Sequence, residues 1–187
     1  MESEKQKSFL RVAEKISDSL LDAQYAIWTL NAIHHCSSAS PEIDESRPLL
    51  MDLIWRGLFD RLYMKIGSVI ERSDGAGNLH YLRSIVMAER DIDQVRRKAI
   101  DDVFLQLETF DELRQWRNKA IAHNDLSFDA EAFYEKHKMH VSNYQPIIDS
   151  LYVMLNTVSY AIAETIYMKP DESEYARILR EAGDLYQ

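Results

Sequence analysis

Apolar residues recur at steps of three and four over most of the chain, which is the spacing that places side chains on one face of an α-helix. The helices that this spacing predicts cover residues 3–35, 47–73, 79–88, 91–107 and 143–167.

The same pattern predicts which positions face the core. In the second helix Leu53 and Ile54 are expected inward, in the fourth Val95, and in the last long helix Ile166. Pro146 is expected in the first turn of that last helix, where its missing N–H costs no hydrogen bond. Residues 170–173 then break the pattern ahead of a short C-terminal helix.

Few residues interrupt these helices. The chain of 187 residues holds only five Gly and four Pro, which favours long helices over a turn-rich sheet protein. The fold class that follows is all-α, an antiparallel bundle of about five main helices plus the short C-terminal one. Residues 1–187 are long enough to form one domain with a sizeable core.

Charge and cysteine content limit the function classes. A net charge of −9 argues against a general nucleic-acid coat, so no DNA partner is expected and any RNA site must be a local basic pocket. The single cysteine, Cys36, cannot form a disulfide within the chain, which fits a reducing cytoplasm. The N-terminus is charged, and residues 150–163 are too short to cross a bilayer, so no membrane association is expected.

Two groups of side chains resemble metal ligands but do not form a site by spacing. His34, His35 and Cys36 are adjacent at a helix end and point in different directions. Asp101 and Asp102 are neighbours whose side chains lie about 100° apart on a helix, so a solvated face is the favoured interpretation. We therefore expect no metal and no other cofactor.

Another amphipathic helix is predicted between these elements and carries the candidate chemistry. Thr109 followed by Glu112 has the spacing of a capping box at its start, and Asn124 and Asp125 provide turn residues just after His123. Its apolar stripe consists of Phe110, Leu113, Trp116, Ala120 and Ile121.

On this helix Arg117, Ala120 and His123 form one row. Each step along the row turns it by roughly 60°, and its ends are about 9 Å apart along the helix axis. The small Ala120 leaves a gap between two long polar side chains, and this gap is suited to a phosphate. Asn118, next to Arg117, adds a neutral donor and acceptor.

The stretch Arg-Asn-Lys-Ala-Ile-Ala-His at residues 117–123 resembles the Arg-x(4–6)-His signature of HEPN domains. With the following Asn-Asp it is most similar to the abortive-infection-protein-like branch of that superfamily, the Abi U type. Residues 71–79 also resemble the link between the second and third helices of that branch. The resemblance implies a helical bundle with the polar end of this helix open at a groove.

The resemblance further implies a metal-independent endoribonuclease that acts as a toxin or in defence against phage. Arg117, Asn118 and His123 would be its catalytic residues. One chain offers a single motif histidine, whereas RNA cleavage needs an acid and a base, so a homodimer is expected. A protein antitoxin is a further possible partner. The substrate-binding positions assigned beside the motif are Arg114, Lys119, Asn124 and Asp125.

Other interpretations of the same residues remain open. Arg117 pairs with a nearby glutamate, and His123 acts as a helix C-terminal cation, if the motif has only a structural role. A non-catalytic module that binds a protein partner or a nucleotide is the second function. His137 and His140 are three residues apart, and a solvent-facing helix is favoured there over a patch that holds RNA.

Overall fold

The computed structural model describes residues 4–39, 47–72, 77–89, 92–110, 113–114, 143–173 and 175–177. The regular structure of these residues is helical, and no strand occurs among them. The all-α class predicted from the sequence is therefore confirmed. None of the helices in these ranges is long and apolar enough to cross a membrane.

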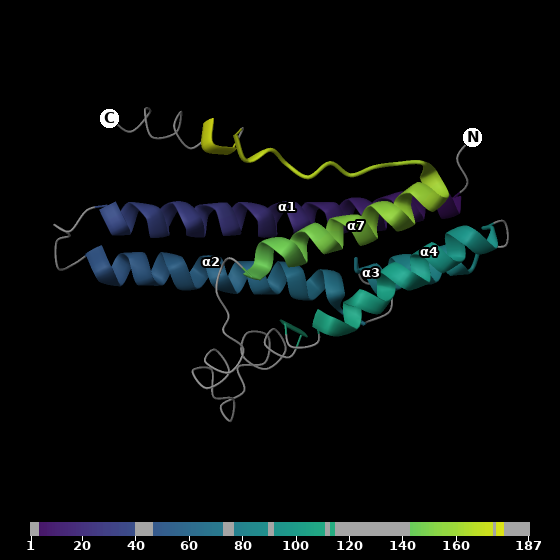
Figure 1. Ribbon diagram of the computed structural model, residues 1–187, viewed down its shortest axis with the longest axis horizontal. Helices are drawn as coiled ribbons and strands as arrows, with labels where there is room; N and C mark the ends of the chain where they lie inside the picture. The colour runs from purple at the N-terminus through teal and green to yellow at the C-terminus, as the bar shows by residue number, and fades with distance from the viewer. Residues whose placement is uncertain are drawn as a thin grey trace, which may run out of the picture.

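The described helices form a layered bundle (Figure 1). The two longest, α1 and α2, run antiparallel, while α7 crosses them and also packs on α3 and α4. The bounds are α1 Glu4–Ala39, α2 Arg47–Ile70, α3 Leu79–Met87, α4 Gln94–Phe104, the 3₁₀ helix η1 Leu105–Phe110 and α7 Tyr144–Ala163.

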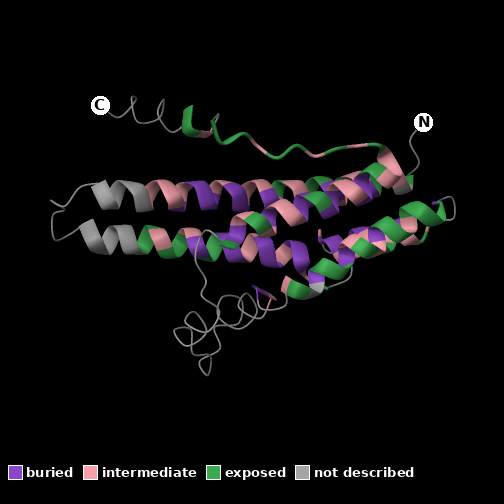
Figure 2. Cartoon of the chain, viewed as in Figure 1, coloured by how far each residue is buried: buried purple, intermediate pink, exposed green. Residues whose placement is uncertain are grey.

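The core follows from the spacing of apolar residues on α1. Ala13, Ile16, Leu20 and Ala23 succeed one another at steps of three and four, and all four are completely buried. Figure 2 shows buried positions along the middle of α1, in the C-terminal half of α2 and along α7. The alanines allow a close approach of neighbouring helices, so one continuous core holds the bundle together.

Polar side chains start the two shorter helices. Asn78 is buried ahead of α3, and its side chain accepts a hydrogen bond from the backbone N–H of Tyr81. Asp93 does the same for α4 through the N–H of Arg96. The link between α2 and α3 thus ends at Asn78, which is the N-cap of α3.

Arg97 fastens the turn between α3 and α4. Its guanidinium donates to three backbone carbonyls, those of Met87, Glu89 and Ile92, at 3.3, 2.6 and 3.1 Å. A planar group with five donors suits such a set of acceptors. The guanidinium thus gives these carbonyls the hydrogen bonds that backbone N–H groups give in regular secondary structure.

The predicted last helix ends earlier than its pattern indicates. α7 stops at Ala163, and Glu164 adopts the left-handed conformation with φ 50° and ψ 27°. Residues 164–171, here called the C-terminal strap, then run back along the bundle without helical structure (Figure 1). Ile166 is therefore exposed, and its predicted place in the core is wrong.

Three further apolar positions are exposed against expectation. Leu53 and Ile54 on α2 and Val95 on α4 have the right helical spacing for burial. In the described part of the chain, however, α2 packs chiefly on α1, and α4 on α7 and η1, so each buries a single stripe. Periodicity alone overestimated the width of these stripes.

The predicted start of the motif helix is also different. Thr109 lies inside η1, and its hydroxyl donates to the carbonyl of Gln106. The α4 pattern that was predicted to reach residue 107 is continued by this 3₁₀ helix. Residues 113–114 are α-helical.

Candidate functional site

The residues of the Arg-x5-His motif lie outside the described part of the chain. This applies to Arg117, Asn118, Lys119 and His123, and to the two turn residues Asn124 and Asp125 as well. His137 and His140 also lie outside it, as do the side chains of residues 34–36. Of the predicted site residues only Arg114 is described: it is half-buried and has an interaction partner. What the structure provides is the frame at both ends of this segment.

At the entry to the segment the chain is fixed by buried apolar side chains. Phe104 ends α4 and is buried, followed by the buried Leu107 and Leu113. Phe110 is partly buried against the same core. Arg114 directly follows Leu113, so its backbone leaves the core at a defined place.

A charged and aromatic cluster supports the end of α4. Arg83 of α3 pairs with Asp101 of α4, and its guanidinium carbon lies 5.3 Å from the centre of the Phe104 ring. The His80 ring approaches the same phenyl group edge-on, with 6.2 Å between ring centres. Asp101 thus serves an ion pair, which agrees with the structural interpretation of the Asp101–Asp102 pair. Within the described ranges no three His, Cys, Asp or Glu side chains gather as metal ligands.

At the exit of the segment α7 begins with a buried aromatic anchor. The hydroxyls of Tyr144 and Tyr63 are hydrogen-bonded, and their rings meet edge-on with centres 5.3 Å apart. Phe59 contacts both rings, and Trp55 lies 4.1 Å from Phe59 between centres. The sequence left open whether Trp55 and Phe59 are buried or form a partner surface; Phe59 is buried, and Trp55 is half-buried.

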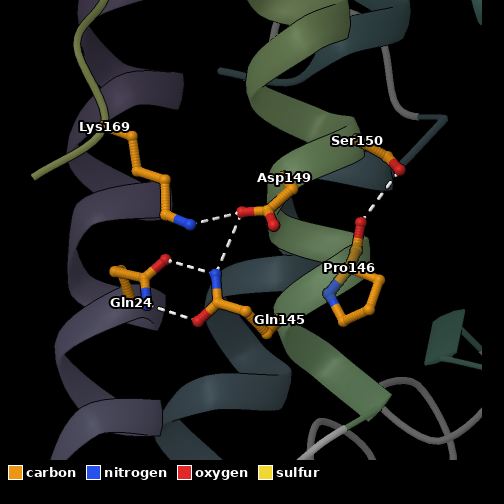
Figure 3. A network of polar contacts seen from close by, with 6 residues as sticks. All are labelled: Gln24, Gln145, Pro146, Asp149, Ser150 and Lys169. Atoms are coloured by element: carbon orange, nitrogen blue, oxygen red, sulfur yellow. Dashed lines mark hydrogen bonds and ion pairs between the residues drawn. The ribbon is translucent and has the colours of Figure 1, made fainter. Parts of the chain in front are cut away.

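The first turns of α7 are tied to α1 by a polar network (Figure 3). Gln24 is completely buried, and its amide exchanges two hydrogen bonds with that of Gln145, at 2.7 and 2.9 Å. The Gln145 Nε2 also donates to the Asp149 carboxylate at 3.0 Å. A buried amide with its partners supplied fixes the register of two helices.

The network continues into the C-terminal strap. The Lys169 ammonium donates to the same Asp149 oxygen at 2.6 Å (Figure 3). Asn156 then holds the backbone of Tyr167 on both sides: its Oδ1 accepts from the Tyr167 N–H, and its Nδ2 donates to the Tyr167 carbonyl. α1, α7 and the strap are therefore linked through side chains.

Sequence reasoning missed this network. Gln24 lies among Ala23, Ala26 and Ile27 on the apolar stripe of α1, and a polar residue at such a place indicates a buried hydrogen bond. Its partner Gln145, 121 residues further along, carries no local signal. Only the folded structure brings the two together.

The pKa of one carboxyl group near the frame depends on its burial and on its lysine and arginine partners. Burial raises the pKa of Asp22 on α1, but Lys65 and Arg61 of α2 outweigh it and hold that pKa below its usual value. The two ion pairs measure 2.7 and 3.1 Å. These bridges join the antiparallel pair α1 and α2.

Comparison with known proteins assigns the chain. The family model HEPN_AbiU2, described as AbiU2, matches residues 7–181. The chain belongs to the HEPN AbiU2 family. The matched span includes Arg114, the motif at residues 117–123 and the whole of α7, so the resemblance recognised in the sequence is confirmed. No curated protein and no solved structure matches the chain.

Membership of an abortive-infection family of HEPN type places the motif and its frame in context. In this chain the Arg-x5-His stretch lies between two buried residues, Leu113 before it and Tyr144 after it. The frame is built from helices that share one core.

Proposed function

We propose that this AbiU2-family protein is a metal-independent endoribonuclease that acts as a cytoplasmic toxin in phage defence, with a protein antitoxin as its possible counterpart. The observation that carries the proposal is the match to an abortive-infection HEPN family over a span that includes residues 117–123. These residues hold a histidine, which can act as acid or base near neutral pH, and an arginine, whose planar charged group suits a phosphate.

The reaction uses the substrate's own nucleophile. The ribose 2′-oxygen attacks the adjacent phosphorus, the bond from phosphorus to the 5′-oxygen breaks, and a 2′,3′-cyclic phosphate and a 5′-hydroxyl result. One His123 imidazole accepts the 2′-hydroxyl proton, and an imidazolium returns a proton to the leaving 5′-oxygen. Arg117 neutralises the charge on the phosphate oxygens, and Asn118 orients one of them.

Two motifs are needed for one reaction. A two-fold homodimer brings two copies of His123 to one cleft, where one acts as base and the other as acid. Arg114 and Lys119 add positive charge for neighbouring phosphates, and Asn124 and Asp125 contact the nucleotide from the turn. A local site of this kind is compatible with a net charge of −9.

The described frame supports the proposal through its rigidity. Catalysis requires the reacting groups to be held within fractions of an ångström. Leu113 before the motif and Tyr144 after it are both buried in the same core. A motif segment anchored at both ends meets this requirement better than one at a free terminus.

Cleavage in the presence of EDTA is the test. Wild type, His123→Ala and the control His34→Ala, a histidine near the end of α1, are compared on single-stranded RNA at matched dimer content. Wild type and the control are expected to produce cyclic-phosphate ends, and His123→Ala to lose about 10²–10⁴ in rate. DNA of the same sequence, which lacks the 2′-hydroxyl, stays intact. Full activity in His123→Ala contradicts the proposal.

A non-catalytic binding module is the second candidate. The acidic balance of the chain favours it, because a nuclease gains from a broad basic surface. If none of several RNAs is cleaved by any variant, this second function takes the place of the first. Binding of a protein or a nucleotide that depends on Arg117 would then identify the groove.

A further inference from the structure

An apolar surface lies open along the seam between α7 and the C-terminal strap. Val153 and Tyr160 on α7 are 58 and 53 % exposed, and Ile166 and Met168 on the strap are 60 and 82 % exposed. These are half of the large apolar side chains that the described residues expose, namely Leu53, Ile54, Val95, Leu105, Val153, Tyr160, Ile166 and Met168.

The hydrogen bonds of Asn156 bring these four residues together. Val153 precedes Asn156 by three positions and Tyr160 follows it by four, so all three share one side of α7. Asn156 binds the backbone of Tyr167 at 2.7 and 3.1 Å, and Ile166 and Met168 are the neighbours of Tyr167 in the chain. The seam is therefore one continuous surface, which we call the seam surface.

The strap is held so that its apolar side chains stay outside. Asn156 of α7 binds the backbone of Tyr167, and Asp149 of α7 binds the Lys169 ammonium. Between these contacts Tyr167 is half-buried, whereas its neighbours Ile166 and Met168 are exposed. Tyr175 follows and stacks on Tyr25, with ring centres 5.1 Å apart, and its hydroxyl bonds that of Thr29. Fixed points on both sides of Met168 prevent the strap from turning this side chain inward.

Acidic groups lie along the strap at the seam surface. Glu164, Asp171 and Glu172 are exposed on or directly after the strap. Burial and then the charge of Glu14 on α1 raise the pKa of Tyr167, which places a further carboxylate beside the strap. Lys169 on the strap is already paired with Asp149, and Arg96 of α4 donates to the carbonyl of Ala161, the residue after Tyr160. An anionic membrane surface is repelled by such a rim, whereas a cationic protein segment is attracted.

We propose that the seam surface of Val153, Tyr160, Ile166 and Met168 is a docking site for a basic protein partner that inserts apolar side chains. The apolar centre and the acidic rim have the division of roles found in protein interfaces, with desolvated contacts inside and steering charges around them. The inference does not rest on nuclease activity, because none of its residues belongs to the motif.

A synthetic probe tests the site on the full chain. The probe is a fluorescein-labelled amphipathic peptide of leucine and lysine, and its binding is followed by fluorescence anisotropy. The double substitution Ile166→Ser with Met168→Ser is expected to weaken binding about tenfold or more. The control Val95→Ser with Leu105→Ser removes two equally exposed apolar residues elsewhere and leaves the affinity unchanged.

The acidic rim is tested through salt dependence. Glu164→Gln with Glu172→Gln is expected to lower the affinity at low salt and to flatten its decline as salt rises. A peptide of leucine and glutamate with the same pattern is expected not to bind. Equal loss in both serine double variants, or no binding by wild type, overturns the proposal.

Other occupants give distinct results. Concentration-dependent self-association that the strap variant abolishes identifies a second copy of the chain as the occupant and overturns the proposal. Peptide binding that occurs only after removal of residues 178–187 assigns the surface to the chain itself and overturns it too. Tighter binding to anionic vesicles than to the peptide overturns it in favour of a membrane. The chain-end and vesicle outcomes leave the EDTA cleavage assay unaffected, so the two proposals fail independently there. If a second copy is the occupant, the strap variant also loses cleavage, because that reaction needs a dimer, whereas cleavage that persists without self-association separates the two surfaces.

Discussion

The side-chain amides of Gln24 on α1 and Gln145 on α7 bind each other in both directions, the Nε2 of each donating to the Oε1 of the other. The pair joins residues 121 positions apart, and Gln24 has no exposed surface. Because α7 begins where the motif segment ends, this pair sets the position of α7 relative to α1.

Gln24→Leu is expected to lower the free energy of unfolding by about 1–3 kcal/mol, because Gln145 loses a partner inside the bundle. The double variant with Gln145→Leu is expected to cost less than the sum of the two single changes. Urea unfolding measures all three variants. Ser150→Ala is the control, since it removes only a bond from the Ser150 hydroxyl to the Pro146 carbonyl on the same helix (Figure 3).

Arg97→Ala is expected to destabilise the protein by about 1.5–3 kcal/mol, because three carbonyls of the turn between α3 and α4 lose a charged donor. The neighbour Arg96 is exposed and donates to a single backbone carbonyl, that of Ala161, at 3.3 Å. Arg96→Ala should therefore change stability by less than 1 kcal/mol, on the order expected for exposed groups. Thermal unfolding followed by circular dichroism distinguishes the two, and equal losses would contradict the assignment.

Gly57→Ala is expected to raise stability by about 0.5–1 kcal/mol, because glycine is a poor helix former and an added methyl meets no described atom within 4 Å. Gly77→Ala provides the contrast: its Cβ would lie 3.0 Å from Cδ and 3.1 Å from Cβ of Lys15. The lysine must shift to admit it, so no gain is expected there. Paired urea titrations give both values, and a loss at Gly57 would indicate that another chain covers this face of α2.

The pH dependence of stability should show a contribution from Tyr152 between pH 10 and 12. Burial, followed by Tyr25 and Asp18, raises the pKa of its hydroxyl to about 12 from the ordinary value of 10. In this window the unfolded chain ionises while the folded chain stays protonated, so stability is complete below pH 10 and declines up to pH 12. Tyr152→Phe is expected to decline less over this window, and Tyr160→Phe, an exposed ring on the same helix, to follow wild type.

Local pattern predicted the helices well and their surroundings less well. The predicted range 47–73 became Arg47–Ile70, and 79–88 became Leu79–Met87, because spacing and caps are local properties. The range 143–167 was too long: the chain leaves α7 at Glu164, where the Asn156–Tyr167 bonds hold the strap, and this contact has no trace in helical periodicity. Val95 likewise has core spacing but lies on a helix at the edge of the bundle.

The candidate site depends on chemistry that the sequence displays directly. Arg117 and His123 were recognisable because an arginine and a histidine at this spacing resemble the signature of HEPN domains, and the family match confirms that assignment. Their catalytic roles stay predictions. Arg114 lies at the edge of the core, next to the buried Leu113. No motif in the sequence indicated this position.

The contact between Thr29 and Tyr175 joins residues 146 positions apart, and α1 meets α7 over much of its length. Contacts between residues so far apart cannot form before the later partner has been synthesised and has left the ribosome. The part of α1 that packs on α7 stays uncovered until α7 has been synthesised. Likewise Tyr25 lacks the ring of Tyr175 that stacks on it until that residue has been made. The core therefore closes only after translation has passed Ala163, the end of α7, and a chain truncated before α7 lacks the helix that packs on α1, α3 and α4.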